Sequence, residues 1–400
     1  MRPPCLKLKP QREKSVLRHH PWVFSGAVDQ TLGSPAPGQT VEVYSSEDQW
    51  LARAAFSPHS QIVARVWTWD EAETIDAGFF QRRIEASANR RTWLQSSTDG
   101  IRLVNAESDG LPGLVVDRYG RFLVVQFLSA GPEHWKGEIV SVLRSMEGIS
   151  GLYERSDVEV REKEDLPQTA GILWGETPSG PVEIVEGQWR FLVDIQGGQK
   201  TGFYLDQRES RAAVRDLVRS LLPGSQVLNA FAYTGAFAVA ALAGGAARVI
   251  NVDSSAAALG LAKQNLALNQ RSAGREDFIE GDVFRVLREY RDSGTSFDGI
   301  ILDPPKLAPS SSQVPRAARA YKDLNWLAFR LTRPGGCVVT FSCSGAVSED
   351  LFQKIVFGAS IDAGREVQIL GKLRQSSDHP VRLSFPEGAY LKGLICRVEQ

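Results

Sequence analysis

The chain has 400 residues, of which 42% are hydrophobic and 23% charged, and its formal net charge is −1. These values are typical of a soluble globular protein of about two or three domains and exclude a disordered or fibrous chain. The nearly neutral net charge favours no particular partner.

The first twenty residues are more basic than the rest of the chain. They hold six lysines and arginines against one glutamate: Arg2, Lys7, Lys9, Arg12, Lys14 and Arg18 against Glu13. Such a segment is either a solvated terminus or an edge that contacts phosphate groups, and both interpretations remain open.

The four cysteines and five histidines do not predict a metal site, because they show no CxxC pair and no zinc-binding spacing. The N-terminus has no hydrophobic signal region, so we expect a cytoplasmic protein without disulfides. The uncharged segment 230–247 is rich in alanine and glycine, which is more typical of a buried turn and helix than of a membrane span.

The first half of the chain predicts two mixed units. Residues 40–68 alternate apolar and polar positions between short turns, which predicts a small antiparallel β unit. Residues 76–94 show helical spacing of large apolar residues and predict a connecting helix. Between 102 and 191 we expect further strands, such as 114–117 and 122–126, around one helix over 132–146.

After about residue 188 the pattern changes to strands that alternate with helices. Continuous apolar runs at 227–229, 249–252, 299–302 and 336–340 indicate strands buried on both faces. This pattern predicts an α/β fold with a doubly wound, mostly parallel sheet. In such sheets ligands bind beyond the carboxyl ends of the strands, so the residues that follow each strand are the candidate site.

Three of these strand ends suit a nucleoside ligand. The turn after residue 229 lets the backbone approach a ligand but lacks GxGxxG, and a plain strand-to-helix turn is the alternative. Asp253 can accept both ribose hydroxyls or cap the helix near Ser254, and Asp282 can bind an adenine amino group. Together they predict an S-adenosylmethionine site of a class I methyltransferase, with first-turn contacts from Asn229, Phe231, Tyr233, Thr234 and Gly235.

The fourth strand end is Asp303-Pro-Pro-Lys306. Two prolines make the turn rigid, so the carboxylate of Asp303 has a defined direction. Amino methylation of a base would favour an aromatic residue at position 306, and Lys306 counts against it.

Cys343, in the sequence TFSCSG, follows the next strand and should emerge beside Asp303. A thiolate that adds to position 6 of a pyrimidine activates position 5, and a carboxylate near N3 stabilises the charge that results. Cys343 and Asp303 fit these catalytic roles, although a filler thiol at a strand end is the alternative. Cys337 and Cys396 lie in apolar runs and are predicted to be inert.

The chain resembles the ribosomal RNA large subunit methyltransferase I family, whose members form 5-methylcytosine in 23S ribosomal RNA. The resemblance spans essentially the whole chain. Its separated motifs are REKS at 12–15, HPWVFSG at 20–26, ESDGLPG at 107–113, YLDQR at 204–208, DPPK at 303–306, FSCSG at 341–345 and PEG at 386–388.

This resemblance implies a PUA β-barrel that binds RNA over 1–75, a connecting helix and middle α+β domain over 76–187, and a Rossmann-like methyltransferase domain over 188–400. It implies S-adenosylmethionine as methyl donor, S-adenosylhomocysteine as product, no metal, and a homodimer. The implied partner is 23S ribosomal RNA or a partly assembled large subunit. The further residues it implies are Gln199, Phe203, Asp206 and Arg208 around the cofactor, where Asp206 could instead be a helix cap, and Lys306, Arg12, Lys14, Arg18 and Trp22 on RNA.

Two other functions remain as alternatives to cytosine-C5 methylation. One is a purine methyltransferase of the same fold, acting on guanine N7 or an amino group, which needs no nucleophile. The other is an RNA-binding assembly factor without turnover. The turn after Asp303 has no second cysteine, so the sequence does not identify the base that removes the C5 proton.

Overall fold

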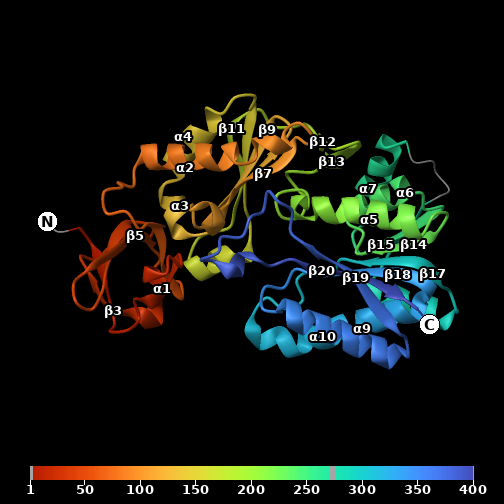
Figure 1. The fold of residues 1–400 in the computed structure, drawn as a ribbon. Helices are drawn as coiled ribbons and strands as arrows, with labels where there is room; N and C mark the ends of the chain where they lie inside the picture. The colour runs from red at the N-terminus through yellow and green to blue at the C-terminus, as the bar shows by residue number, and fades with distance from the viewer. Residues whose placement is uncertain (1–2, 271–275, 400) are drawn as a thin grey trace. The chain divides into compact units, whose positions relative to one another are not determined.

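The computed structural model describes residues 3–270 and 276–399 and divides into two compact units (Figure 1). Unit 1 consists of Met1–Gly187, Val193–Leu205 and Ser377–Gly388. Unit 2 consists of Gln188–Leu192, Asp206–Ser376 and Ala389–Gln400. Unit 1 therefore includes two short segments, Val193–Leu205 and Ser377–Gly388, that are separated from its main part in the sequence by residues of unit 2. The predicted three-domain division of the chain stays a prediction.

Unit 1 begins with a six-stranded sheet in the order β2-β6-β5-β4-β1-β3. The predicted antiparallel unit over 40–68 is confirmed, because β4 pairs with β5 and β5 with β6 in antiparallel register. Alternate side chains of these strands fill a core that includes Leu6, Val43 and Val66. The elements are β1 (Cys5–Leu8), α1 (Lys14–Leu17), β2 (Trp22–Phe24), β3 (Val28–Leu32), β4 (Thr40–Tyr44), β5 (Trp50–Phe56) and β6 (Ile62–Thr68).

The second sheet of unit 1 has the order β11-β10-β9-β8-β7. The connecting helix predicted over 76–94 is shorter in the structure, where α2 (Ala77–Asn89) is followed by a short 3₁₀ turn, Thr92–Leu94. Asp76 caps α2 by accepting from the Phe79 N–H at 2.8 Å. The strands are β7 (Gly100–Asn105), β8 (Leu114–Tyr119), β9 (Phe122–Phe127), β10 (Gly151–Ser156) and β11 (Thr169–Gly175), and a hairpin of β12 (Val182–Glu186) and β13 (Trp189–Val193) follows.

The single helix predicted over 132–146 is wrong in one respect. The structure has two helices, α3 (Ala130–His134) and α4 (Lys136–Arg144), separated at Trp135, whose φ of −95° and ψ of 18° lie outside the helical region. Helix α3 starts before Pro132, a position that proline permits because the first turn of a helix tolerates it. Gly131 in that turn packs so closely that a Cβ atom there would lie 2.5 Å from Ala55 Cβ.

Unit 2 contains a seven-stranded sheet in the order β16-β15-β14-β17-β18-β20-β19. The first five strands run parallel to one another, whereas β20 runs antiparallel to both β18 and β19. This arrangement confirms the predicted mostly parallel sheet. The strands are β14 (Gln226–Ala230), β15 (Arg248–Asp253), β16 (Glu276–Glu280), β17 (Phe297–Leu302), β18 (Thr332–Ser342), β19 (Val367–Arg374) and β20 (Lys392–Val398).

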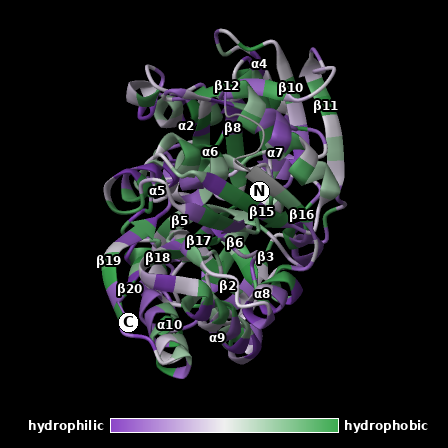
Figure 2. Cartoon of the chain, turned by 90° about the vertical axis from the view of Figure 1, so that its right-hand side faces the viewer, coloured by the Kyte–Doolittle hydropathy of each residue, from purple (hydrophilic) through white to green (hydrophobic). Residues whose placement is uncertain are grey.

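Helices cover both faces of this sheet, which explains the continuous apolar runs in β14, β15, β17 and β18. Figures 1 and 2 show α5, α6 and α7 on one face and α8, α9 and α10 on the other. Helix α6 is almost entirely buried, from Phe237 to Leu242, as its hydrophobic sequence requires. The helices are α5 (Arg208–Leu221), α6 (Ala236–Ala243), α7 (Ala256–Leu268), α8 (Val283–Asp292), α9 (Val314–Leu331) and α10 (Glu349–Ala363).

The order of the strands determines where a ligand crevice forms in the sheet. Strand β14 has β15 on one side and β17 on the other, so successive connections from the centre of the sheet run in opposite directions. Such a reversal opens a crevice at the carboxyl ends of the strands. The turns after β14, β15, β16, β17 and β18 are the ones that the sequence singled out.

Candidate active site

The two serines of the TFSCSG turn are buried, whereas the cysteine between them is partly exposed. Ser342 donates to the hydroxyl of Tyr321 at 3.0 Å, and Ser344 exchanges a hydrogen bond of 3.0 Å with the same hydroxyl. Both serines are fully buried. Cys343 stands between the two serines in the sequence. It is partly exposed, and its Sγ lies 4.0 Å from the carbonyl oxygen of Pro304.

The environments of the four cysteines, all of them in the described part of the chain, differ sharply. Burial raises the pKa of Cys337 to about 11 and that of Cys396 to about 12, so both thiols stay protonated at neutral pH. Cys5 lies in β1 of unit 1. Cys343 alone combines partial exposure with a place at the carboxyl end of a strand in the parallel sheet.

Asp303 directly follows β17, beside the turn of Cys343. Its Oδ2 accepts a hydrogen bond of 3.0 Å from the side-chain amide of Gln207. Gln207 is buried, and its other amide atom, Oε1, has no hydrogen-bond partner among the described residues. Sequence reasoning missed Gln207, although it stands between two residues that were singled out in YLDQR. An amide with a free buried acceptor suits a polar ligand.

Asp206 occupies a different position from the helix cap that was the alternative. It lies in a short 3₁₀ turn, Leu205–Gln207, and Gln207 holds the N-cap position of α5. The Asp206 carboxylate accepts from the hydroxyl of Tyr390 at 2.7 Å, and its carbonyl accepts from Ser376 at 2.8 Å. Arg208 is the first residue of α5.

The turn after β14 is conformationally strained. Phe231 and Tyr233 have φ angles of 60° and 45°, a region that bulky residues rarely adopt, and Gly235 has a φ of 75°. Such strain persists only where the surroundings enforce it, and it clusters at ligand sites. Gly235 is also required by space, because a Cβ atom there would lie 2.8 Å from Ala262 Cβ.

The Asp253 carboxylate connects two turns at the carboxyl edge of the sheet. One oxygen accepts from the Tyr233 N–H at 2.8 Å and the other from the Ser255 N–H at 2.9 Å. Asp253 does not cap α7, because the hydroxyl of Ser255 does so by accepting from the Ala258 N–H. The carboxylate is therefore oriented by backbone donors, which leave further acceptor positions on each oxygen for a ribose.

Asn229 and Thr234 are buried in the same region. The Asn229 amide donates to Asn251 on the adjacent strand at 2.9 Å, and the Thr234 carbonyl accepts from Asn265 at 2.9 Å. The hydroxyl oxygen of Thr234 has no hydrogen-bond partner among the described residues. This unsatisfied hydroxyl, the glycine turn and the oriented carboxylate fit the polar groups of an adenosyl cofactor.

Asp282 is the N-cap of α8 and accepts from the Arg285 N–H at 2.9 Å. Phe231 and Phe284, which follow β14 and Asp282, meet edge to face with their ring centroids 6.5 Å apart. Asp282 thus has a structural role, and its predicted contact with adenine stays a prediction.

Gln199 and Phe203 lie in the Val193–Leu205 segment of unit 1. Gln199 accepts from the hydroxyl of Tyr204 at 2.6 Å, and the buried Phe203 accepts from Tyr119 through its carbonyl at 3.4 Å. Their predicted contacts with the cofactor stay predictions.

The residues predicted to contact RNA fall into two groups. Arg12, Lys14 and Arg18 in unit 1 and Lys306 in unit 2 are exposed and form no ion pair with any described residue. The indole of Trp22 is partly buried and donates to the Glu107 carboxylate at 2.8 Å. The four cations are free to meet phosphate groups, whereas Trp22 is engaged within unit 1.

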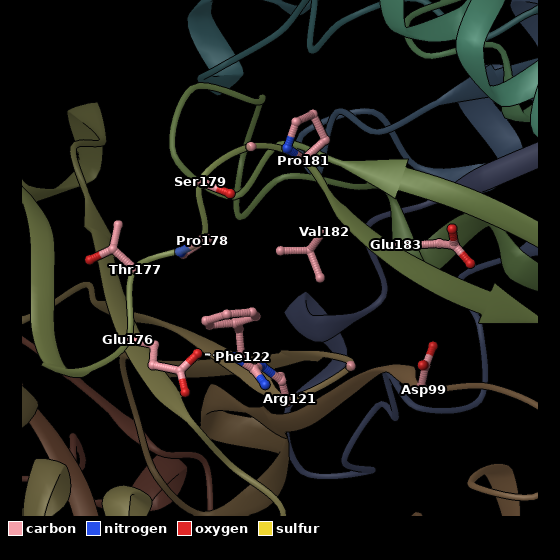
Figure 3. A pocket seen from close by; sticks show the side chains of 12 residues that line it. Asp99, Arg121, Phe122, Glu176, Thr177, Pro178, Ser179, Pro181, Val182 and Glu183 are labelled. Carbon is pink, nitrogen blue, oxygen red and sulfur yellow. Dashed lines mark hydrogen bonds and ion pairs between the residues drawn. The ribbon is translucent and has the colours of Figure 1, made fainter.

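Unit 1 has a hollow of about 720 Å³, and Figure 3 shows the side chains that line it. Asp99, Glu176 and Glu183 line it, and Arg121 is neutralised by its ion pair with Glu176. An excess of carboxylates repels a phosphate backbone, so we assign this hollow no part in RNA binding. In residues 3–270 and 276–399, no cluster of His, Cys, Asp and Glu could hold a metal ion. No helix of that part has the length and hydrophobicity needed to cross a bilayer.

Comparison with protein families gives the class of the molecule. Residues 6–69 match the model of a PUA-like domain, and residues 156–363 match that of an S-adenosylmethionine-dependent methyltransferase. Two solved structures share the fold over 98% of this chain and 99% of theirs. One is assigned as a methyltransferase from Streptococcus mutans (TM-score 0.84, 24% identity), and the other is a methyltransferase-like protein in complex with SAH (TM-score 0.86, 23% identity). The fold and the site therefore define an S-adenosylmethionine-dependent methyltransferase with an N-terminal PUA-like domain.

Curated relatives narrow this class to one family. The chain is 51% identical to ribosomal RNA large subunit methyltransferase I of Salmonella enteritidis over 397 residues, which cover 99% of this chain and 98% of that protein. It is also 51% identical to the enzyme of the same name from Yersinia pestis over 389 residues, 97% of each chain. The chain belongs to the ribosomal RNA large subunit methyltransferase I family, and S-adenosylmethionine is its methyl donor.

Proposed function

We propose that this enzyme methylates ribosomal RNA of the large subunit and forms 5-methylcytosine at one specific cytosine of 23S ribosomal RNA. The substrate class rests on the family, whose relatives are named for it over nearly the full length of the chain. The position on the base rests on chemistry, because only carbon methylation of a pyrimidine needs a nucleophile beside the methyl donor.

One observation carries the choice of reaction. The partly exposed thiol of Cys343 and the carboxylate of Asp303 follow adjacent parallel strands, β18 and β17, and the Sγ of Cys343 lies 4.0 Å from Pro304 O. A nucleophile and a carboxylate thus stand together at the edge of the sheet where the cofactor turns also end. Methylation of a purine nitrogen would leave Cys343 without a role.

The roles of the residues follow from this arrangement. The Cys343 thiolate adds to C6 of the cytosine, and the electrons of the C5–C6 double bond make C5 nucleophilic. S-adenosylmethionine supplies an electrophilic methyl group, which C5 accepts, and S-adenosylhomocysteine is the leaving group. Loss of the C5 proton then restores the double bond and expels the thiolate from C6, so Cys343 is regenerated.

Asp303 stabilises the base during this addition when its carboxyl group is protonated, because it then donates to N3, where the negative charge from the thiolate collects. Because Pro304 and Pro305 restrict the turn, and the Gln207 amide holds Oδ2 at 3.0 Å, the carboxyl group can stay aimed at N3 of the ring. Lys306 is exposed next to this turn and is suited to a phosphate of the RNA. Ribosomal RNA without its full set of proteins is the substrate form that we favour. The homodimer stays a prediction.

A mechanism-based trap tests the proposal. Fluorine at C5 cannot leave as a proton does, so 23S ribosomal RNA containing 5-fluorocytosine should remain covalently bound to the enzyme after methyl transfer. We expect a labelled RNA–protein band in denaturing electrophoresis with labelled S-adenosylmethionine, and its loss in Cys343→Ala. Because Cys337 and Cys396 are buried, Cys337→Ala is the matched control and should keep the band.

Transfer of label to ordinary RNA by Cys343→Ala would refute the covalent mechanism. Label in RNA without a trapped band would assign the enzyme to another position on the base. Absence of both signals would favour a role in assembly without turnover, and so would a failure of S-adenosylhomocysteine to stabilise the protein.

A further inference from the structure

A buried lysine lies on the strand next to the candidate nucleophile. Lys392 is the first residue of β20, and the antiparallel register of β18 and β20 sets it opposite Ser342, the residue before Cys343. Lys392 is only 8% exposed. Lysine is almost never buried to this extent unless its charge is compensated, so the position calls for a specific reason.

The ammonium group of Lys392 binds the turn that carries Cys343. Its Nζ donates to the carbonyl oxygen of Ser344 at 2.6 Å and to that of Val347 at 2.7 Å. The Val347 N–H also donates to the Ser344 carbonyl at 3.0 Å. The Ala308 N–H also donates to the Ser344 hydroxyl at 3.0 Å. The segment just after Cys343 is therefore held both by Lys392 and by the backbone at Ala308.

Of the titratable groups that act on Lys392, we assign the Cys343 thiolate as the one that compensates its positive charge. Among the described residues no carboxylate lies within ion-pair distance of Lys392. The titratable groups that act on it are Cys343, Glu349 and Lys306. Glu349 is already paired with Lys372 at 2.8 Å and Arg374 at 3.3 Å, and Lys306 repels an ammonium.

The pKa of Lys392 is lowered to about 8, mainly because the group is buried, and a charged Cys343 offsets part of this shift. The group is therefore mainly an ammonium at pH 7 and loses its charge above about pH 8. The interaction between two charges is mutual, so a thiolate that stabilises the ammonium is stabilised by it to the same degree. A cation near a cysteine favours the nucleophilic form of the thiol.

We propose that Lys392 is a positioning residue for the nucleophile: its buried ammonium holds the turn of Cys343 and supplies the positive charge that favours the Cys343 thiolate. The inference rests on the proposed role of Cys343 in methylation. The proton of the thiol goes to solvent, and Lys392 keeps its own proton throughout the reaction. Lys392 neither touches the base nor donates to it.

The test is the pH dependence of alkylation of Cys343 by iodoacetamide in the RNA-free protein, followed by mass spectrometry of the peptide that contains Cys343. We expect the midpoint for the unaltered protein to lie below that of a cysteine peptide, about 8.5. In Lys392→Met it should move up by about one pH unit, which is a tenfold loss of thiolate at neutral pH. Lys354→Met is the matched control, because Lys354 is an exposed lysine on α10, and it should leave the profile unchanged.

Methylation kinetics give a second reading. Lys392→Met should lower kcat at pH 7 by about tenfold, with an unchanged KM for RNA and recovery towards pH 9 as the thiol ionises. A purely structural lysine would lower activity equally at every pH. An unchanged alkylation profile in a folded Lys392→Met would overturn the inference. If that variant does not fold, a midpoint at or above that of the peptide in the unaltered protein overturns it instead.

Failure of the proposed function is a separate result. Methylation that survives in Cys343→Ala would remove the covalent mechanism whatever the alkylation profile shows, whereas alkylation reports on Lys392 without any RNA.

Discussion

At the scale of single residues, the side chains that aim the reactive groups are as informative as the reactive groups themselves. Ser342, Ser344 and Tyr321 form a buried hydroxyl network behind Cys343, and Gln207 holds Asp303. Hydroxyls that satisfy one another in the interior fix the turn that carries the thiol of Cys343. The sequence TFSCSG therefore contains both the candidate nucleophile and two of the side chains that fix its turn.

Gln207 provides a prediction at this scale. Gln207→Leu keeps the size of the side chain but removes the amide that donates to Asp303. Hydrogen bonds to charged groups contribute about 1.5–3 kcal/mol, so we expect kcat for 5-methylcytosine formation to fall by roughly 10- to 100-fold. Binding of S-adenosylhomocysteine, measured by calorimetry, should stay within a few-fold of that of the unaltered protein.

Gln168→Leu is the control for this variant, because Gln168 is an exposed amide in unit 1 that donates only to Glu162 among the described residues. It should keep full activity. Unchanged turnover by Gln207→Leu would show that Asp303 does not depend on this amide for its orientation.

At the scale of elements, the cofactor turns depend on one another. The strained turn after β14 is held by the carboxylate of Asp253, which ends β15 and accepts from the Tyr233 N–H. The two strands are parallel neighbours, so their carboxyl ends emerge side by side. A carboxylate on one strand thus stabilises the backbone conformation of the turn on the other.

Asp253→Ala tests this coupling. Loss of the carboxylate removes the predicted ribose acceptor and releases the Tyr233 turn, so we expect affinity for S-adenosylhomocysteine to fall by about 10-fold or more. Isothermal calorimetry measures the change. Asp216→Ala, at an exposed carboxylate of α5 that pairs with Arg215, is the control and should bind normally. Equal affinities of the two variants would exclude Asp253 from the cofactor site.

At the scale of the whole molecule, cations outside the catalytic unit are available for RNA. Arg12, Lys14 and Arg18 are exposed in unit 1 without carboxylate partners among the described residues, although the chain as a whole carries a net charge of −1. Local charge, rather than net charge, decides where a phosphate backbone is held. The PUA-like match over residues 6–69 includes all three side chains.

The triple variant Arg12→Ala, Lys14→Ala, Arg18→Ala provides the prediction at this scale. If each cation meets one phosphate, the slope of log K against log salt for RNA binding should become shallower by about 2 to 3. Fluorescence anisotropy at several salt concentrations gives this slope. Arg121→Ala, whose cation is paired with Glu176, is the matched control. A loss of affinity that does not change with salt would exclude the three residues as phosphate contacts.

Much of the fold and part of the site could be predicted from the sequence, for identifiable reasons. Apolar runs without alternation predicted the parallel sheet of unit 2, because strands covered on both faces leave that pattern. The break between α3 and α4 at Trp135 was not predicted, since the 132–146 segment keeps helical spacing on both sides of it. The positions of Ser255 as the cap of α7 and of Gln207 before α5 also differ by one or two residues from those expected.

The sequence by itself determined the chemistry that is available: a cysteine between serines after a strand, a carboxylate before two prolines, acidic residues at the ends of two other strands, and a glycine turn after a third. These are local properties, because the residues next to one another in the sequence determine where strands end and turns form. Only the tertiary structure decided which distant side chains support them. Gln207 reaches Asp303, and Lys392 reaches Ser344, across 96 and 48 positions of the chain. Such partners leave no spacing pattern, because the register of strands that are far apart in sequence brings them together.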